Sequence, residues 1–476
     1  ELAAVSGRLD AVQWACARTE LTADVFGRAL AAAADRGHLA IVRWLHARQK
    51  SSEGEAFAAA AAGLTGTHAG CRALGAAITN GHLDVVRFLV DSGYQLDETE
   101  RRRLSRSARR GDLELLQYLH ANELTRDVAG WIDNAAAGGH LRVVEWAYKT
   151  FPSGSGSRGA SRRCNAMDNA ARGGHLEVVQ WLHASHWASE CSAFAMDRAA
   201  ENGHLDVVRW LHEHRSEGST TRGMDTAASG GHLHVVRWLQ AHRSEGCTTL
   251  AMDAAAASGH LAVVQWLHDH RSEGCSTAAM DGAATSGHLD VVRWLHNTRT
   301  EGCTTAAMDG AAMNGHLEVV KWLHVHRTEG CSRAAMNMAA ANGHIDVVKW
   351  LHANRSEGCS TNAMDGANSL DVLQWLHDHR TEGCTRVAVV DAARVGNIEK
   401  LLFLREKRIE VVSDRAAGVA LRGGSFEIFQ WLQANYPHRV EREAVDLVST
   451  GRSGALALFL QLESARSSAE AGVATG

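Results

Sequence analysis

Residues 275–302 read CSTAAMDGAATSGHLDVVRWLHNTRTEG, and variants of this 28-residue unit follow one another through the centre of the chain. Six methionines stand 28 residues apart, each followed by Asp or Asn: Met224, Met252, Met280, Met308, Met336 and Met364. A repeat of this length is one supersecondary unit, and its apolar face stays exposed to water unless a neighbouring repeat covers it. The spacing therefore predicts an elongated stack of repeats whose function lies on a surface rather than in a pocket.

Each repeat is expected to form two helices joined by a tight turn. The first helix is predicted over residues 278–286, with Ser276 or Thr277 as its N-cap. Gly287 can adopt the left-handed conformation that ends this helix, and a second helix is predicted over residues 288–296. The apolar positions of the second helix predict a buried stripe of Leu289, Val292 and Leu295.

The letters AAMDGAA at 278–284, followed after two residues by GHLDVV at 287–292, resemble the ankyrin repeat, where the corresponding letters are TPLHLAA and GHLEVV. The first segment departs from the family, since Pro is missing, Met280 stands for Leu and Asp281 stands for His. The unit is also 28 residues long rather than about 33. The resemblance implies an all-α, ankyrin-like helix-turn-helix solenoid with shortened loops. It also implies a non-enzymatic scaffold for protein–protein interaction.

The pattern weakens toward both ends of the chain but recurs there, for about 16 units in all. We expect degenerate N-terminal repeats over residues 1–150, a Gly/Ser-rich insertion over 151–160, regular 28-residue repeats over 161–383, and degenerate C-terminal repeats with a cap over 384–476. Within the regular part, residues 362–376 lack three residues at the helix turn, which predicts a kink in the stack.

Composition and charge narrow the function classes. The net charge of −5 over 476 residues is too mild to predict nucleic-acid or membrane binding by the whole molecule. No stretch approaches the roughly 18 apolar residues of a membrane-spanning helix. Because the sequence holds no paired nucleophile and base, phosphate-binding glycine loop or HExxH motif, we expect no enzyme, no small-molecule substrate and no cofactor.

Five of the ten cysteines occupy the same place in successive repeats: Cys247, Cys275, Cys303, Cys331 and Cys359. Stacked helices lie about 8–10 Å apart, which exceeds the roughly 7 Å limit between the Cα atoms of a disulfide. Unpaired, packed thiols favour a reducing compartment, so we expect a cytoplasmic location and leave a nuclear one open. The chain begins at Glu1, inside a repeat, so a targeting segment before it stays open as well.

Side chains that stay constant along the stack are interpreted as structural. The tryptophans, one per repeat as in Trp294, are expected to pack between layers rather than to stack on bases. Asp281 and its equivalents, with Asn337 in one repeat, are expected to accept hydrogen bonds from a neighbouring helix start. Pairs such as Arg299 and Glu301 are expected to form a surface charge ladder between layers.

The 28 histidines are a candidate metal-binding set, but their spacing argues against it. His288 and His296 lie about 12 Å apart along one helix, given a rise of about 1.5 Å per residue. Zinc ligands must converge on the metal at about 2.0–2.3 Å, and no Cys-x2-Cys or His-x3-His pair is present. We therefore expect turn and helix-end hydrogen bonds from the histidines, and no metal site.

Three positions vary from repeat to repeat while their neighbours do not, namely those of Ala278, Gly282 and Thr285. Their i, i+4, i+7 spacing places them on one face of the first helix, and the resemblance implies that this face lines a concave groove. These positions are basic in the early repeats and small and weakly apolar in the middle ones. The candidate partner-binding residues among them are Arg72, Arg102, Arg106, Arg109, Arg172, Phe194, Arg198, Arg222, Leu250, Met313 and Met338.

The sequence therefore predicts a scaffold, monomeric when free, that binds a partner protein in this groove. Repeats three to eight are expected to receive an acidic segment, and repeats nine to twelve a more apolar one. The basic residues 101–106 can equally form a solvated face or bind a partner, and as a motif they also resemble a basophilic kinase site at Ser105 or an import signal. Two other classes stay open: a permanent structural subunit of a larger assembly and, less favoured, a nucleic-acid binder that uses the same arginines.

Overall fold

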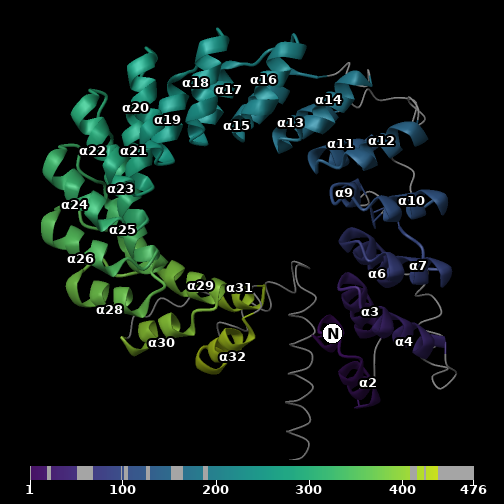
Figure 1. Ribbon diagram of the computed structural model, residues 1–476. Coiled ribbons are helices and arrows are strands. Elements are labelled where there is room, and N and C mark those ends of the chain that lie inside the picture. Colours follow the sequence, from purple (N-terminus) through teal and green to yellow (C-terminus); the bar gives the residue numbers. More distant parts are fainter. Residues whose placement is uncertain are drawn as a thin grey trace, which may run out of the picture. The chain divides into compact units, whose positions relative to one another are not determined.

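The computed structural model describes residues 2–18, 23–50, 68–97, 99–100, 105–124, 129–151, 165–185, 191–407, 415–422 and 425–437. All regular structure in these residues is helical, which confirms the predicted all-α fold. The chain forms two compact units, Glu1–Cys247 and Thr248–Gly476, and each is a row of helix pairs (Figure 1). The predicted segments 1–150, 151–160, 161–383 and 384–476 stay a prediction, and residues 152–160 of the insertion lie outside the described residues.

In the first unit a first helix and the second helix that follows it make one layer. The first helices are α1 (Leu2–Val5), α3 (Ala23–Asp35), α6 (His68–Asn80), α9 (Ser105–Ala108), α11 (Ala129–Ala137), α13 (Ala166–Gly173), α15 (Ala193–Glu201) and α17 (Thr221–Ser229). The second helices are α2 (Leu9–Arg18), α4 (Leu39–Lys50), α7 (Leu83–Asp91), α10 (Leu113–Ala121), α12 (Leu141–Thr150), α14 (Leu176–Ala184), α16 (Leu205–His214) and α18 (Leu233–His242).

The second unit continues with the same alternation. Its first helices are α19 (Thr249–Ala257), α21 (Thr277–Thr285), α23 (Thr305–Met313), α25 (Arg333–Ala341), α27 (Thr361–Gly366), α29 (Arg386–Val395) and α31 (Ala416–Arg422). Its second helices are α20 (Leu261–His270), α22 (Leu289–Thr298), α24 (Leu317–His326), α26 (Ile345–Asn354), α28 (Leu370–His379), α30 (Ile398–Glu406) and α32 (Phe426–Asn435).

The layer of α21 and α22 shows why these residues form helices. The backbone of Ser276 is extended, and its hydroxyl accepts a hydrogen bond from the backbone N–H of Ala278 at 3.2 Å, so Ser276 caps α21 as predicted. The observed α21 begins and ends one residue before the predicted helix 278–286. Gly287 has φ +83°, the left-handed conformation expected at this turn, and α22 follows after His288.

The core of each layer lies between its two helices. In α22 the buried residues are Val291, Val292 and Leu295. Leu289, which was predicted to belong to this stripe, is only half-buried, and Val291 is buried in its stead. Val292 and Leu295 were thus predicted correctly, and the buried stripe begins at Val291 rather than at Leu289.

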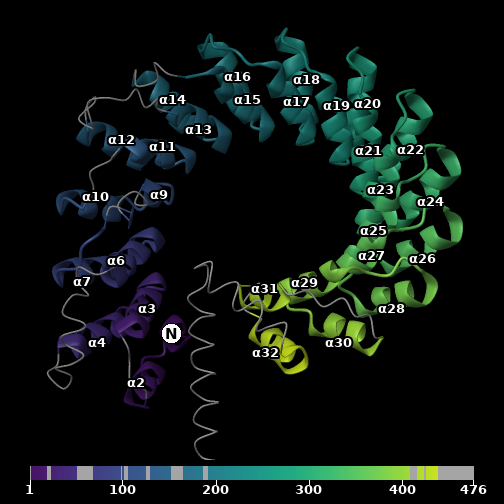
Figure 2. The same ribbon diagram turned by 180° about the vertical axis from the view of Figure 1, so that it is seen from behind.

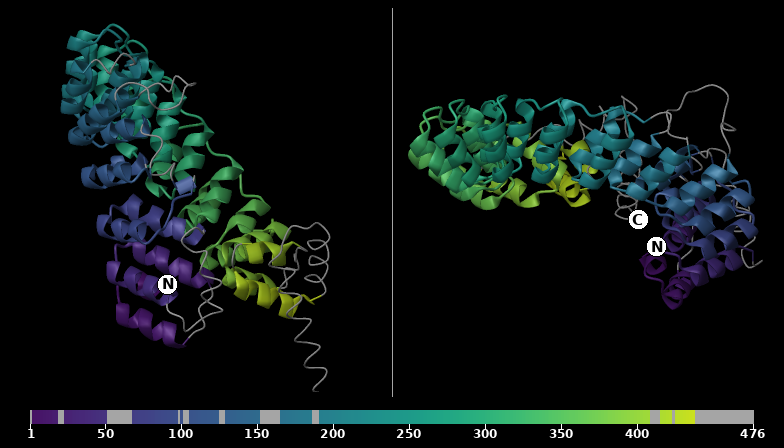
Figure 3. Two further views of the ribbon diagram at one scale, coloured as in Figure 1. Left: turned by 90° about the vertical axis from the view of Figure 1, so that its right-hand side faces the viewer. Right: turned by 45° about the horizontal axis from the view of Figure 1, so that its top comes forward.

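Small residues bring adjacent first helices close together. A Cβ atom added to Gly282 would lie 2.7 Å from the Cβ of Ala257 in the preceding layer, so only glycine fits without a shift. The second helices hold Trp and His side chains between layers and stand further apart. Within each unit the first helices consequently lie on the inner side of the row and the second helices on the outer side, as Figures 1 and 2 show from opposite directions. Figure 3 shows the same stacking in two further views.

We call the positions equivalent to Ala278, Gly282 and Thr285 of the first helices the inner face. The solvent-exposed side of the second helices is the outer face. The residues that join one layer to the next occupy the remaining positions of the helices and loops.

The layer of α27 and α28 departs from the others at the predicted deletion. Helix α27 has only six residues and ends at Gly366. Lys400 of α30, in the next layer, is fully buried, and its Nζ donates a hydrogen bond to the backbone carbonyl of Asp365 at 2.6 Å. Regular layers have a valine at this position, such as Val291. The last carbonyls of a helix have no backbone N–H partner within that helix. Lys400 thus donates a hydrogen bond to one of these carbonyls at the end of α27.

Candidate functional site

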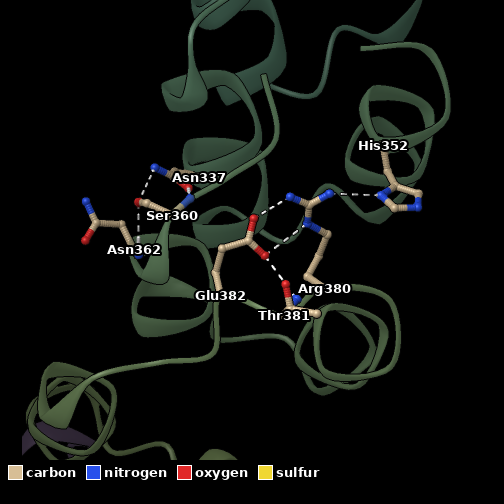
Figure 4. Close-up of polar contacts among 7 residues, drawn as sticks. All are labelled: Asn337, His352, Ser360, Asn362, Arg380, Thr381 and Glu382. Carbon is tan, nitrogen blue, oxygen red and sulfur yellow. Dashed lines mark hydrogen bonds and ion pairs between the residues drawn. The ribbon is translucent and has the colours of Figure 1, made fainter. Parts of the chain in front are cut away.

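The constant Asp column joins each layer to the next. Asp309 accepts two hydrogen bonds from Ser332, one from its backbone N–H at 2.8 Å and one from its hydroxyl at 2.6 Å. Asn337 takes the place of Asp in the next layer: its Oδ1 accepts from the backbone N–H of Ser360 and its Nδ2 donates to the Ser360 hydroxyl, both at 2.9 Å (Figure 4). The expected hydrogen bond to a neighbouring helix start is thus confirmed for both residue types.

Arginine–glutamate pairs fasten the loops between layers. Arg380 forms a bidentate ion pair with Glu382, and its Nη1 donates to Nδ1 of His352 in the preceding layer at 3.4 Å (Figure 4). The side-chain hydrogen bond from Arg380 lowers the pKa of Glu382 to about 2. Equivalent pairs are Arg215 with Glu217, Arg243 with Glu245, Arg271 with Glu273, Arg299 with Glu301, Arg327 with Glu329, and Arg355 with Glu357.

The predicted surface charge ladder between layers is wrong in two respects. Each ion pair joins two residues of one loop rather than two layers, as Arg380 and Glu382 show. The pair is also largely buried, with only 24% and 25% of the two side chains exposed. Hydrogen bonds connect the pair to the preceding layer: Arg380 donates to His352, and in the equivalent pair Glu357 accepts from the backbone of Cys331.

The tryptophans pack between layers, as predicted. The Trp322 ring is half-buried and stacks on His326 with ring centroids 4.4 Å apart. The edge of His296, from the preceding layer, meets the same ring at 5.2 Å. Because one ring of its own helix and one of the preceding layer contact the Trp ring, the Trp column is a packing element rather than a platform for bases.

The histidines after the turn glycines reach back to the preceding layer. Nε2 of His140 lies 2.8 Å from the backbone carbonyl of Arg109, and Nε2 of His82 lies 2.9 Å from that of Asp35. These carbonyls are at the ends of first helices, where intrahelical donors are missing. The histidines therefore make the helix-end hydrogen bonds that the sequence predicted.

In the part of the chain that the structure describes, no group of three or more His, Cys, Asp or Glu residues is placed to hold a metal ion. The cysteines that the structure describes form no disulfide, and burial raises the pKa of Cys275 to about 11, so its thiol stays protonated at neutral pH. No helix within the described ranges is long and apolar enough to cross a membrane.

The inner face of the first unit holds the arginines predicted to bind a partner. Its exposed members are Arg72, Arg109, Arg172, Phe194 and Arg222, and Arg198 is half-buried. Arg102 lies outside the described residues, and Arg106 belongs to α9 with its side chain outside them. The structure therefore brings six of the eight candidates of this unit onto one face.

The inner face of the second unit is small and apolar. Leu250 is 62% exposed and Met338 is 43% exposed, while Met313 is half-buried. Sequence reasoning missed Val387 of α29, which is 54% exposed at the position equivalent to Ala278. The signal was Thr385, which caps α29 as Ser276 caps α21 and thereby fixes the register of this degenerate repeat.

Arginines of the inner face differ from those of the loops in their partners. Arg215 and Arg243 are each ion-paired with a glutamate. The side chains of Arg172 and Arg222 make no hydrogen bond or ion pair within the described residues, and Arg198 contacts only the neutral Asn169, at 3.5 Å. The guanidinium groups of Arg172 and Arg222 are thus not engaged by other side chains within the described residues.

Two family models match the chain over most of its length. One, described as ankyrin repeats in three copies, matches residues 1–100. The other, described as ankyrin repeats in many copies, matches residues 132–183, 196–240, 252–296, 277–324 and 304–352.

No curated protein sequence matches the chain significantly. Among solved structures, the crystal structure of the pentatricopeptide repeat protein PPR10 from maize is similar, with 10% sequence identity and a TM-score of 0.28, over 91% of this chain and 78% of that one.

Proposed function

Because the chain belongs to the ankyrin repeat family, we propose that it is a non-enzymatic scaffold that binds a partner protein on its inner face. Ankyrin repeats generally mediate protein–protein interactions. The observation that carries the proposal is that different positions of each repeat join the layers and face the solvent on the inner side. Positions that join layers stay constant, whereas the inner-face positions vary and expose their side chains.

The two units offer different surfaces to a partner. The inner face of the first unit presents Arg72, Arg109, Arg172 and Arg222 to solvent, and this basic character suits an acidic segment. The inner face of the second unit presents Leu250 and apolar or small neighbours, which suit a less polar segment. Arginine supports specific binding here because its planar fork can bind a carboxylate through two hydrogen bonds.

Affinity purification from the native source tests this proposal. The inner-face variant replaces Arg72, Arg109, Arg172, Arg198 and Arg222 by Ala. The matched control removes five exposed arginines of the outer face in the same unit, namely Arg43, Arg87, Arg142, Arg209 and Arg237. Both variants lose the same charge, so any difference between them reports on location.

We expect the inner-face variant to lose a defined protein partner that the wild type and the outer-face control both retain. Equal melting temperatures of the three proteins would show that the loss is not a folding defect. Identical partner sets for both variants would refute the inner-face assignment. Partners lost equally from both variants, with a steep dependence on salt, would instead indicate non-specific binding of a polyanion such as nucleic acid.

A further inference from the structure

Three arginines of the first unit come from three successive layers. Arg172 lies near the C-terminus of α13, Arg198 in the second half of α15 and Arg222 at the start of α17. In sequence they occupy different positions of their repeats, those of Thr285, Gly282 and Ala278 respectively. Neighbouring first helices are offset along their axes, and this offset, which we call the stagger, brings the three different positions opposite one another.

The stagger is visible at the contact between α15 and α17. A Cβ atom added to Gly223 would lie 3.6 Å from the Cα of Asp197, so these two residues stand opposite one another. Arg222 precedes Gly223, and Arg198 follows Asp197. The two arginines therefore extend from adjoining stretches of backbone.

The same stagger relates Arg198 to Arg172. In the second unit a Cβ atom added to Gly310 would lie 2.9 Å from the Cβ of Thr285, so these two positions stand opposite one another in neighbouring layers. Arg198 and Arg172 occupy the equivalent positions of α15 and α13. Arg172, Arg198 and Arg222 thus come from backbone positions that lie opposite one another on neighbouring first helices, with one arginine per layer. We call these three residues the arginine row.

The charges nearest the arginine row balance it only in part, since Asp168 acts on Arg198 through its charge and Glu201 lies one turn from Arg198 on the same helix. The nearby carboxylates of Asp168 and Asp197 are occupied as acceptors for the helix starts at Ser192 and Thr220. Within the described residues no carboxylate pairs with any member of the row. Three like charges side by side repel one another, and an anionic chain laid along them relieves this repulsion.

The spacing of the row selects the geometry of that chain. Packed helices are about 8–10 Å apart, and small residues at the contact favour the shorter part of this range, so successive arginines project from points roughly 8–9 Å apart. A polyproline II segment has three residues per turn and a rise of about 3.1 Å per residue, so every third side chain points the same way at about 9.3 Å intervals. In a β-strand, side chains on one face recur at about 6.8 Å. On a helix, positions four residues apart recur at about 6 Å.

Resting on the proposed function, we propose that the arginine row binds an extended, polyproline II-like segment of the partner protein with an acidic residue at every third position. Three such residues span the row from Arg172 to Arg222. Each carboxylate then meets one guanidinium in a charge-assisted hydrogen bond. If the acidic side chains stood at every second or every fourth position, their spacing would differ from that of the arginines, and the third carboxylate would not reach the third guanidinium.

Fluorescence polarisation of the full chain with labelled peptides at low ionic strength tests the register. The peptides have equal length and charge, consist of Gly, Ser and Pro, and carry three Glu residues at spacings of two, three or four. We expect the spacing of three to bind about fivefold or more tighter than the others, since a displaced peptide loses at least one charge-assisted hydrogen bond. The Arg172→Ala, Arg198→Ala, Arg222→Ala variant should lose this preference, and an Arg142→Ala, Arg209→Ala, Arg237→Ala control should keep it.

Equal affinity for all three spacings, a preference that survives in the triple variant, or no binding of any peptide would overturn the inference. Tighter binding of a single-stranded oligonucleotide of the same charge would overturn it in favour of a nucleic acid. The proposed function fails on a different result, namely partner proteins that are retained when all five inner-face arginines are removed. The two failures are therefore distinguishable.

Discussion

The carboxylate of Asp253 in α19 accepts two hydrogen bonds from Ser276 of the next layer, from its backbone N–H at 2.8 Å and from its hydroxyl at 2.7 Å. The same hydroxyl accepts from the backbone N–H of Ala278 and so caps α21. One carboxylate therefore both orients the N-cap of the next helix and fixes the position of that helix against its own layer. Since the bond recurs between layers, it couples the folding of each repeat to its neighbour.

Replacing Asp253 by Ala should destabilise the contact between α19 and α21 more than replacing it by Asn. Alanine leaves the N–H of Ser276 without its acceptor, at a cost of about 1–3 kcal/mol, whereas Asn keeps an acceptor, as Asn337 does for Ser360. Hydrogen exchange of the amides at the start of α21 measures this locally. Equal exchange rates in the two variants would contradict the role given to the carboxylate.

Replacing Gly287 by Ala should be costlier than the same change at Gly383. Both glycines have left-handed φ values, +83° and +66°, so both substitutions carry a backbone strain of about 1–2 kcal/mol. At Gly287 the new Cβ would also lie 2.7 Å from the ring of His316, whereas no described atom is within 4 Å at Gly383.

A double-mutant cycle isolates that second effect. In a His316→Ala background the extra cost of Gly287→Ala should shrink, with a coupling of about 0.5–3 kcal/mol in chemical denaturation. Additive costs would show that the turn glycine is required for its backbone conformation alone.

The Arg380–Glu382 pair should make stability depend on pH in the acid range. The hydrogen bond from Arg380 lowers the pKa of the Glu382 carboxyl from an ordinary 4.5 to about 2. A lowered carboxyl pKa contributes stability above pH 4.5, and this contribution is lost as the pH falls toward 2. The melting temperature of the wild type should therefore exceed that of Glu382→Gln at pH 6, and the gap should close near pH 2. A gap independent of pH would rule out the ion pair as its cause.

Lys400 should tolerate Met better than Ala. Alanine leaves a cavity and removes the donor to the carbonyl of Asp365, which together predict a loss of about 2–4 kcal/mol. Methionine fills most of the space and removes a buried charge, so its cost should be smaller. Hydrogen exchange of the amides in α27 measures the difference. An Ala variant that is as well protected as the wild type would contradict the claim that Lys400 stabilises the short helix α27.

Local signals made much of the fold predictable from the sequence. Ser276 as a cap and Gly287 as a left-handed residue act through their own backbone, so their roles can be read without knowing the neighbours. The Asp column was also predictable, because the exchange of Asp for Asn at position 337 keeps an acceptor but not a charge.

Features that depend on the distance between layers were not predictable. Arg380 and Glu382 stand two residues apart in a loop, which suggests a solvated pair, and only the packing of the preceding layer buries them. Lys400 reads as an exposed charge until the shortened α27 is seen above it. The alignment of Arg172, Arg198 and Arg222 likewise depends on the stagger between first helices, which the repeat length alone does not contain.

Photocrosslinking from Phe194 tests most directly whether the inner face is the binding surface. Phe194 is 52% exposed on α15, so p-benzoylphenylalanine in its place keeps the ring and its surroundings. The same amino acid in place of Gln180, exposed on the second helix α14, is the matched outer-face control. Binding on the inner face predicts that a partner protein from the native source crosslinks at position 194 and not at position 180. Crosslinks at position 180 alone, or equally at both, would contradict it.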